Sequence, residues 1–260
     1  MQRSAGYGTT HNPRIVALNG LMTAPLFFVE AADLDADRIV VAGAEGRHAA
    51  DVRRLRAGER VDIGDGRGRV AHGRIAEASR SNLVVDVESR EEIASPSPRF
   101  VVVQALAKGG RDLDAVQSMT EVGVDEIVPW TAERSVARPT DRTVARWSAT
   151  AREAAKQSRR AWLPVVTGVT PTDGVCARLA DASLAVVLHE EATTPLALLT
   201  LPDDGDVVLV VGPEGGLTAT EVDALGAAGA RVCRLGDSVL RTSTAGVAAL
   251  SVLSAATRWR

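Results

Sequence analysis

Several residue types that mark particular protein classes are scarce in this chain of 260 residues. It has only two cysteines, Cys176 and Cys233, far apart in apolar surroundings, which predicts reduced core residues rather than a disulfide framework. Four histidines without close spacing predict no metal site. No apolar run is long enough to span a membrane, and residues 1–20 lack the apolar stretch of a signal peptide. We therefore expect a globular, cytoplasmic protein that binds neither membrane nor metal.

Lysine and aromatic side chains are also scarce, and the charges are unevenly distributed. Aromatic residues make up 3% of the chain, which argues against an aromatic platform for stacking bases. Residues 47–80 hold nine Arg and five acidic residues, residues 134–160 hold eight basic and two acidic residues, and residues 161–260 hold six basic and eleven acidic residues. Two basic regions indicate that a polyanion binds to part of the surface, although solvated helix faces would explain either region alone.

The first half of the chain predicts a small β-domain. Strands are expected at residues 26–30, 38–41, 60–64, 68–78 and 83–88, with a short helix at 45–56. Asp65 and Gly66 form a hairpin signal between two of these strands. Residues 90–98 are polar and rich in proline, which is typical of a linker. We divide the chain into a disordered extension (1–22), a β-barrel domain (23–92), a linker (93–98) and a second domain (99–260).

The second half predicts an α/β domain. Continuous apolar strands are expected at residues 100–106, 126–130, 184–189, 207–211 and 231–235, and helices at 112–123, 141–160 and 242–257. Strands without alternation that are separated by helices indicate a parallel sheet covered on both faces. The last helix is apolar nearly all round, which predicts burial against the sheet or against a second subunit.

Three loops that follow predicted strands carry the residues best suited to chemistry. The loop at 212–216 reads Gly-Pro-Glu-Gly-Gly, and the capping box from Thr218 to Glu221 starts a helix just after it. The loop at 234–245 holds Gly236, Arg241 and three consecutive hydroxyl residues, more than one helix cap requires. A third loop covers 188–193. Parallel sheets bind ligands at the carboxyl ends of their strands, so we expect the loops to converge on one pocket. A plain turn remains the alternative for the glycine loop, which matches neither the P-loop nor the dinucleotide-binding pattern.

The segments "VVGPEGGLTATEV" and "RLGDSVLRTSTA" resemble the signature loops of the SPOUT methyltransferase superfamily. In particular they resemble the ribosomal RNA small subunit methyltransferase E family (RsmE), which methylates N3 of a uracil in 16S rRNA. Residues 48–66, 105–136 and 151–160 are also similar to that family, and the likeness runs in order over residues 26–259. One departure is that the family often has a lysine where this chain reads Gln117-Ser118-Met119-Thr120; Arg111 or Arg134 would then replace an RNA contact.

The resemblance implies a fold, a cofactor and a partner. The implied fold is a PUA-like or OB-like β-barrel that helps to hold RNA, followed by a SPOUT α/β domain with a deep trefoil knot. S-adenosylmethionine would lie in the knot between the three loops. The family also implies a homodimer whose product is N3-methyluridine in the 16S rRNA of the small ribosomal subunit, and a substrate uridine that is single-stranded or splayed out.

The site residues follow from the resemblance. Those expected to contact the cofactor are Leu188, His189, Glu190, Gly212, Pro213, Glu214, Gly215, Gly216, Leu235, Gly236, Leu240, Arg241, Thr242, Thr244 and Ala245. The catalytic candidates are Arg241, Glu190, Glu214 and Thr244, with Glu191 as a further possible base. Either a carboxylate removes the N3 proton, or Arg241 stabilises the uracil anion, and the sequence leaves both open. The expected RNA contacts are Arg47, His48, Arg53, Arg54, Arg56, Arg111, Arg134, Arg152, Arg159 and Arg160.

One substitution tests the glycine loop. We expect Gly215→Val to abolish cofactor binding with the fold intact, because its side chain would fill space that the ligand needs. Three rival functions stay open: a non-catalytic RNA-binding ribosome-assembly factor, a dinucleotide-dependent oxidoreductase, and a SPOUT enzyme that methylates a ribose 2′-oxygen or guanine N1. The sequence after the strand at 100–106 reads Ala-Lys-Gly-Gly, which argues against the oxidoreductase.

Overall fold

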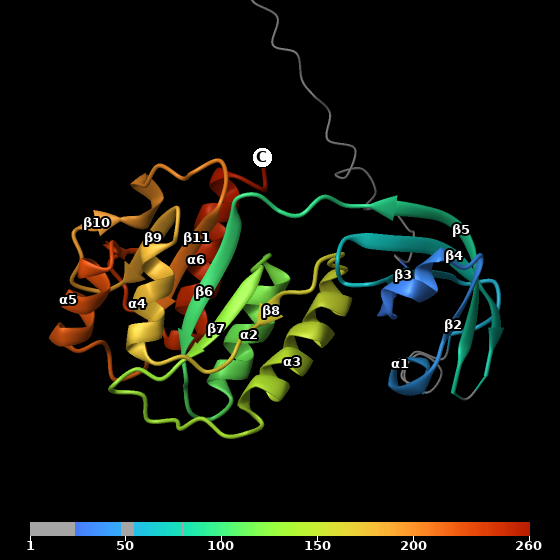
Figure 1. Cartoon of the computed structure of the whole chain (residues 1–260), viewed down its shortest axis with the longest axis horizontal. Coiled ribbons are helices and arrows are strands. Elements are labelled where there is room, and N and C mark those ends of the chain that lie inside the picture. The colour runs from blue at the N-terminus through green and yellow to red at the C-terminus, as the bar shows by residue number, and fades with distance from the viewer. Residues whose placement is uncertain (1–23, 48–54, 80) are drawn as a thin grey trace, which may run out of the picture.

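The protein consists of two units, each built around its own sheet (Figure 1). The computed structural model describes residues 24–47, 55–79 and 81–260. The first unit contains β1 (Leu26–Phe28), β2 (Arg38–Val41), β3 (Arg60–Gly64), β4 (Arg69–Ala78) and β5 (Leu83–Glu92), with the 3-10 helix η2 (Ala31–Asp35) and the short helix α1 (Gly43–Arg47). Its strand order is β1-β3-β4-β5-β2. β1 and β3 are parallel and the other pairs antiparallel, so the described strands form a curled, half-barrel sheet.

Alternating side chains explain how the first sheet forms its core. In β2 the residues alternate between exposed and buried, because successive strand side chains point to opposite faces. Phe27, Ile39 and Ile63 belong to the apolar cluster on the inner face. The expected hairpin between β3 and β4 is confirmed: Asp65 Oδ1 accepts hydrogen bonds from the backbone N–H groups of Arg67 (2.7 Å) and Arg69 (3.2 Å).

Two expectations for this unit were wrong at their ends. The expected strand at 83–88 continues to Glu92, because residues 89–92 pair with residues 69–72 of β4. The expected helix at 45–56 does not include Leu55 or Arg56, and residues 48–54 lie outside the described part. Leu55 instead packs against the core of the sheet, and the N–H of Gly58 bonds to the carbonyl of Ile75 (2.7 Å), which leads the chain into β3.

The second unit is a parallel sheet with helices on both faces, as predicted. Its strands are β6 (Arg99–Ala105), β7 (Glu126–Trp130), β8 (Val165–Val166), β9 (Leu184–Leu188), β10 (Thr194–Pro195), β11 (Asp206–Val211) and β12 (Arg231–Arg234), in the order β10-β12-β9-β11-β6-β7-β8. Its helices are α2 (Arg111–Glu121), α3 (Thr143–Ser158), α4 (Thr172–Ala180), α5 (Ala219–Ala227) and α6 (Thr242–Ala256), with the 3-10 turn η4 (Leu196–Leu198). Helices α2, α3 and α6 cover one face, and α4 and α5 the other. The sequence did not predict α4, β8 or β10.

Strand order places the ligand-binding edge of this sheet. The chain enters at the interior strand β6, extends through β7 and β8 on one side, and then builds β9, β11 and β12 on the other. The direction in which successive strands are added to the sheet therefore reverses between β6 and β11. Open parallel sheets bind ligands at the carboxyl ends of strands next to such a reversal.

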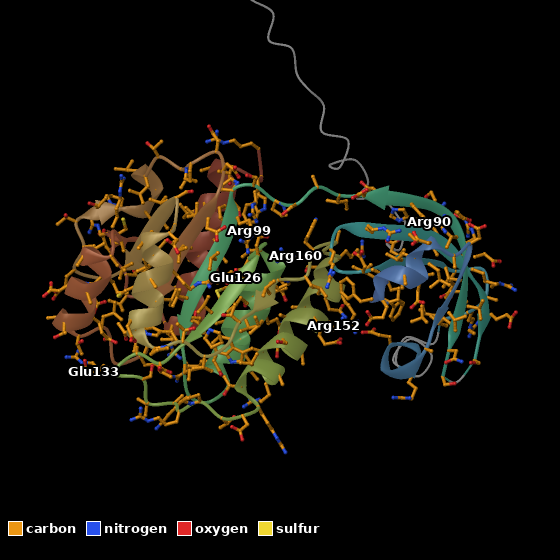
Figure 2. The ribbon with its side chains drawn as sticks, viewed as in Figure 1. Arg90, Arg99, Glu126, Glu133, Arg152 and Arg160 are labelled. Carbon is orange, nitrogen blue, oxygen red and sulfur yellow. The ribbon has the colours of Figure 1, made fainter. Side chains whose placement is uncertain are left out.

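Helix α3 joins the two units. The side chains of Leu26 and Phe28 from β1 pack on Ala155 of α3. Arg152 lies over the ring of Phe28 and donates through Nε to Glu45 of α1 (3.1 Å). Figure 2 shows Arg152 on the side of α3 that faces the first unit. Apolar contacts and ion pairs thus fix the orientation of the two units.

Among the residues that the structure describes, no helix is long and apolar enough to cross a membrane.

Candidate functional site

The three loops meet at one cavity of about 320 Å³. It lies beyond the ends of β9, β11 and β12, as the strand order indicates. Of the residues that the sequence assigned to the cofactor, those lining this cavity are Leu188, His189, Glu190, Gly212, Pro213, Glu214, Gly216, Leu235, Gly236, Leu240, Arg241, Thr242 and Ala245. Gly215 and Thr244 do not line it. The sequence missed Val211 and Leu217, which flank the loop at 212–216, and Arg234, Ser238 and Val239, which lie within the loop at 234–245.

Hydrogen bonds hold the three loops in place. The N–H of His189 bonds to the carbonyl of Cys233 (2.9 Å), so the loop after β9 is fixed to β12. The hydroxyl of Thr242 donates to the carbonyl of Gly212 (2.8 Å), which ties the start of α6 to the end of β11. The predicted capping box at α5 is present, since Thr218 accepts from the N–H of Glu221 (3.2 Å). The cavity therefore has walls that are bonded to one another.

Gly215 has a different role from the one predicted. A Cβ at Gly215 would stand 3.0 Å from Cβ and 3.1 Å from the carbonyl oxygen of Arg134. The guanidinium of Arg134 donates in turn to the carbonyls of Gly215 (3.3 Å) and Leu217 (3.4 Å). A side chain at this position would therefore collide with the segment supporting the loop, and not with a ligand in the cavity. Arg134, expected to contact RNA, braces the glycine loop from behind.

The three candidate bases differ in their surroundings. The carboxylate of Glu214 accepts from the Arg111 guanidinium and from the N–H of Lys108, both at 3.3 Å. Glu190 lines the cavity, is exposed, and has no side-chain partner among the described residues. Glu191 does not line the cavity. The geometry therefore leaves Glu190 as the carboxylate that is free to act at the mouth of the cavity.

Arg241 stands just before α6, where it caps the helix with its backbone. Its carbonyl accepts from the N–H groups of Thr244 (2.8 Å) and Ala245 (2.9 Å). Its side chain is exposed, lines the cavity, and has no partner in the described part of the chain. Thr244 is likewise exposed but does not line the cavity, so its catalytic assignment loses support.

The expected RNA contacts differ in how far their side chains are exposed. Arg47 and Arg56 are exposed, and Arg111 reaches the cavity. His48, Arg53 and Arg54 lie outside the described residues. Arg159 is exposed and ends α3 in a left-handed conformation (φ 54°).

Arg152 and Arg160 are already used by the fold. Arg152 joins the two units, as described above. The Arg160 side chain is only 12% exposed, pairs with Asp125 (3.3 Å) and donates to the carbonyl of Thr120 (3.0 Å). Burial lowers the pKa of the Arg160 guanidinium, and the charge of Asp125 opposes that shift. Figure 2 shows Arg160 beside the sheet. The assignment of Arg160 to RNA was wrong, because charge counted along a sequence carries no information on burial.

In the described part of the chain, no group of three or more His, Cys, Asp or Glu side chains is placed to hold a metal ion.

Comparison with known proteins gives consistent matches. The family described as "RNA methyltransferase domain" matches residues 95–254, and "RNA methyltransferase PUA domain" matches residues 41–88. "Ribosomal RNA small subunit methyltransferase E" of Mycobacterium tuberculosis is 42% identical over 247 residues, covering 92% of this chain and 94% of its own. The protein of that name in Bacillus subtilis is 29% identical, covering 85% and 91%.

A similar solved structure comes from Legionella pneumophila and is described as a methyltransferase in complex with the bound cofactor SAM. It is 27% identical to this chain, with a TM-score of 0.79, and the match covers 90% of this chain and 98% of that one.

Proposed function

The chain belongs to the ribosomal RNA small subunit methyltransferase E family, and on this basis we propose that it transfers a methyl group from S-adenosylmethionine to N3 of a uridine in 16S rRNA of the small ribosomal subunit. The observation that carries the proposal is that the three loops line one shared cavity. Similarity to a SAM-bound structure and to relatives named for small-subunit rRNA supports the cofactor and the substrate.

The cavity suits S-adenosylmethionine in size and lining. Its volume of about 320 Å³ falls in the range usual for small-molecule sites. Leu188, Leu235 and Leu240 offer apolar surface for an adenine ring. A Cβ at Gly216 or Gly236 would meet nothing within 4 Å, so the backbone there is open to a ligand. We propose that these residues hold the cofactor, with loop backbone groups bonded to its adenine and ribose.

The bound cofactor would supply a methyl group that its sulfonium has already activated. When the methyl group passed to N3, the electron pair of its bond to sulfur would stay on sulfur and N3 would give up its proton, so residues of this chain would have to stabilise the uracil anion and receive that proton. We assign the stabilisation of the developing uracil anion to Arg241, whose guanidinium has no competing partner in the described chain. We assign the proton to the carboxylate of Glu190, because Arg111 and Lys108 already occupy that of Glu214.

RNA binding is proposed to rest on arginine contacts to phosphates. Arg47 and Arg56 in the first unit are exposed, and the match to an RNA methyltransferase PUA domain supports a role for that unit in holding RNA. The scarcity of aromatic residues favours phosphate contacts over stacking. A cytoplasmic location follows from a ribosomal substrate.

We also propose that the protein is a homodimer with a trefoil knot in its second unit. Val239 and Leu240 are 76% and 36% exposed at the rim of the cavity. Apolar side chains beside a binding site are well placed to contact a second copy.

The decisive experiment is methyl transfer from labelled S-adenosylmethionine to small ribosomal subunits that lack the modification, followed by nucleoside analysis. N3-methyluridine at one position is the expected product, and naked 16S rRNA serves as the comparison substrate. Label in a ribose 2′-oxygen or in guanine N1 would overturn the target atom but leave the cofactor. No transfer together with no cofactor binding would favour a non-catalytic RNA-binding factor.

A further inference from the structure

A hydrogen-bonded chain runs from the hydrophobic core to the wall of the cavity, and it begins at Gln104. This residue lies on the interior strand β6 and is fully buried. Phe100 and Val102, on the same face of β6, belong to the core cluster under α2, α3 and α6. An amide buried among apolar side chains no longer bonds to water and requires hydrogen-bond partners within the protein.

Those partners lead to the cavity. Gln104 Nε2 donates to the hydroxyl oxygen of Thr242 (2.9 Å) and to the carbonyl of Ala105 (3.2 Å). The Thr242 hydroxyl donates in turn to the carbonyl of Gly212 (2.8 Å). A hydroxyl has one proton, so an amide N–H bonded to its oxygen directs that proton to the other acceptor. The direction of the chain is therefore from Gln104 through Thr242 to Gly212.

The chain joins two walls of the site. Gly212 is the first residue after β11, and Thr242 is the first residue of α6. Both line the cavity, whereas Gln104 does not. Gln104 can therefore influence a ligand only through the two residues that it orders.

We propose that Gln104 is a positioning residue for the cofactor site. By keeping the proton of Thr242 on the carbonyl of Gly212, it sets the spacing of the two walls between which S-adenosylmethionine binds. This inference rests on the proposed function, because that function places the cofactor between these walls.

The amide oxygen of Gln104 makes it possible to distinguish a role in positioning the site from a role in stabilising the fold. Gln104 Oε1 is buried and has no hydrogen-bond partner among the described residues. Gly246 of α6 lies beside it, and a Cβ there would stand 2.6 Å from Sδ of Met119 and 3.6 Å from Oε1. An unpaired buried oxygen destabilises the fold. Replacing the amide by an apolar group of similar shape should therefore leave the stability of the fold unchanged or raise it. The fixed spacing between the two cavity walls should be lost.

The test compares Gln104→Met with the wild-type protein. Calorimetry should show a dissociation constant for S-adenosylmethionine about tenfold higher in the variant, the scale of one lost hydrogen bond. The melting temperature should stay equal or rise. In methylation assays the KM for S-adenosylmethionine should rise by a similar factor, while kcat at saturating cofactor stays within about threefold.

Three further variants make the result specific. Thr242→Val should weaken cofactor binding, Thr242→Ser should restore most of it, and Gln104→Met combined with Thr242→Val should bind no worse than Thr242→Val alone. Non-additivity of this kind is expected when one residue acts only through the other. Val102→Ala, on the same face of β6, is the matched control: it should lower the melting temperature without changing the dissociation constant.

The possible failures are distinguishable. If the wild-type protein binds S-adenosylmethionine and Gln104→Met binds it equally well, the inference about Gln104 is overturned and the proposed function stands. If the wild-type protein does not bind S-adenosylmethionine, the proposed function fails and the inference falls with it. If Gln104→Met does not fold, the Thr242 variants test the inference instead. A Thr242→Val protein that binds S-adenosylmethionine with wild-type affinity would show that the hydrogen bonds from Gln104 through Thr242 to Gly212 do not position the cofactor site.

Discussion

The two edges of the parallel sheet hold their charged side chains in opposite ways. At the amino edge, the carboxylate of Asp125 is buried, pairs with Arg160 and Arg258, and accepts from the N–H of Phe100 (2.8 Å). At the carboxyl edge, Arg241 faces the cavity without a side-chain partner among the described residues. The amino edge consumes its charges in the fold, whereas the carboxyl edge pairs Arg111 with Glu214 but leaves the Arg241 side chain without a partner in the described chain.

The amino edge extends this pairing to its neighbours. Glu126 pairs with Arg99 (2.9 Å) and with Arg178, and Figure 2 shows Arg99, Glu126 and Arg160 around the same part of the sheet. Arg258 also lies over the ring of Phe100 and donates to the carbonyl of Gly123 (2.6 Å). Arginine thus serves stability at the amino edge, whereas the proposed function gives the unpartnered Arg241 at the carboxyl edge a role in recognition.

The largest effect that tests this contrast is on stability at the amino edge. Asp125→Ala would leave two guanidinium groups without their shared carboxylate, so the free energy of unfolding should fall by about 3–5 kcal/mol. Denaturant titration measures it. The matched control is Asp86→Ala, which breaks an ion pair with Arg38 whose partners are 61% and 57% exposed and should cost at most about 1 kcal/mol. Equal losses in the two variants would show that the buried cluster is not a stabilising element.

The next largest effect is expected at the carboxyl edge, where a substitution should lower activity and leave stability nearly unchanged. Arg241→Ala should lower kcat for methyl transfer by about 10²–10³, the scale of one lost electrostatic contact to a transition state. The free energy of unfolding should change by less than about 0.5 kcal/mol, because this side chain has no hydrogen bond or ion pair with the residues that the structure describes. Arg231→Ala, at an exposed arginine of β12 outside the cavity lining, is the control and should keep full activity. A loss in kcat below about threefold would remove Arg241 from the proposed mechanism.

Gly215→Val lies between the two extremes, because it should affect both stability and binding. Its side chain would press on Arg134, so we expect stability to fall by about 1–3 kcal/mol and cofactor affinity to fall with the displaced loop. Thermal unfolding and calorimetry measure the two quantities. Gly226→Val in α5 is the control, since a Cβ there meets nothing within 4 Å. Loss of binding with unchanged stability would instead support the earlier expectation that the side chain fills ligand space.

The smallest effect concerns RNA affinity. Arg56→Glu should weaken binding of an rRNA fragment a few-fold and reduce the slope of log affinity against log salt by about one, as expected for a lost phosphate contact. Filter binding over a salt series measures both. Arg160→Lys should leave the salt slope unchanged because its side chain is buried. An unchanged slope in Arg56→Glu would exclude this arginine from the RNA surface.

Local patterns predicted much of the architecture. The apolar strands, the long helices and the hairpin at Asp65 were recognisable because each depends on residues close together in sequence. Element ends were less accurate, as the extension of β5 to Glu92 shows, since partner strands decide where pairing stops. The short elements α4, β8 and β10 were missed because their sequences carry little periodicity.

The candidate site shows the same division. The sequence by itself determined the three loops and most of the residues around the cavity, because glycines, hydroxyls and charged residues after apolar strands are local signals. Tertiary structure alone decided which arginines remain available, that Gly215 packs on Arg134, and that Gln104 connects to the cavity wall. These outcomes depend on contacts between distant segments: Asp125 meets Arg258 across 133 residues, and Gln104 meets Thr242 across 138. No local pattern encodes such pairs, because burial and partner choice are set only when the sheet and its helices pack together.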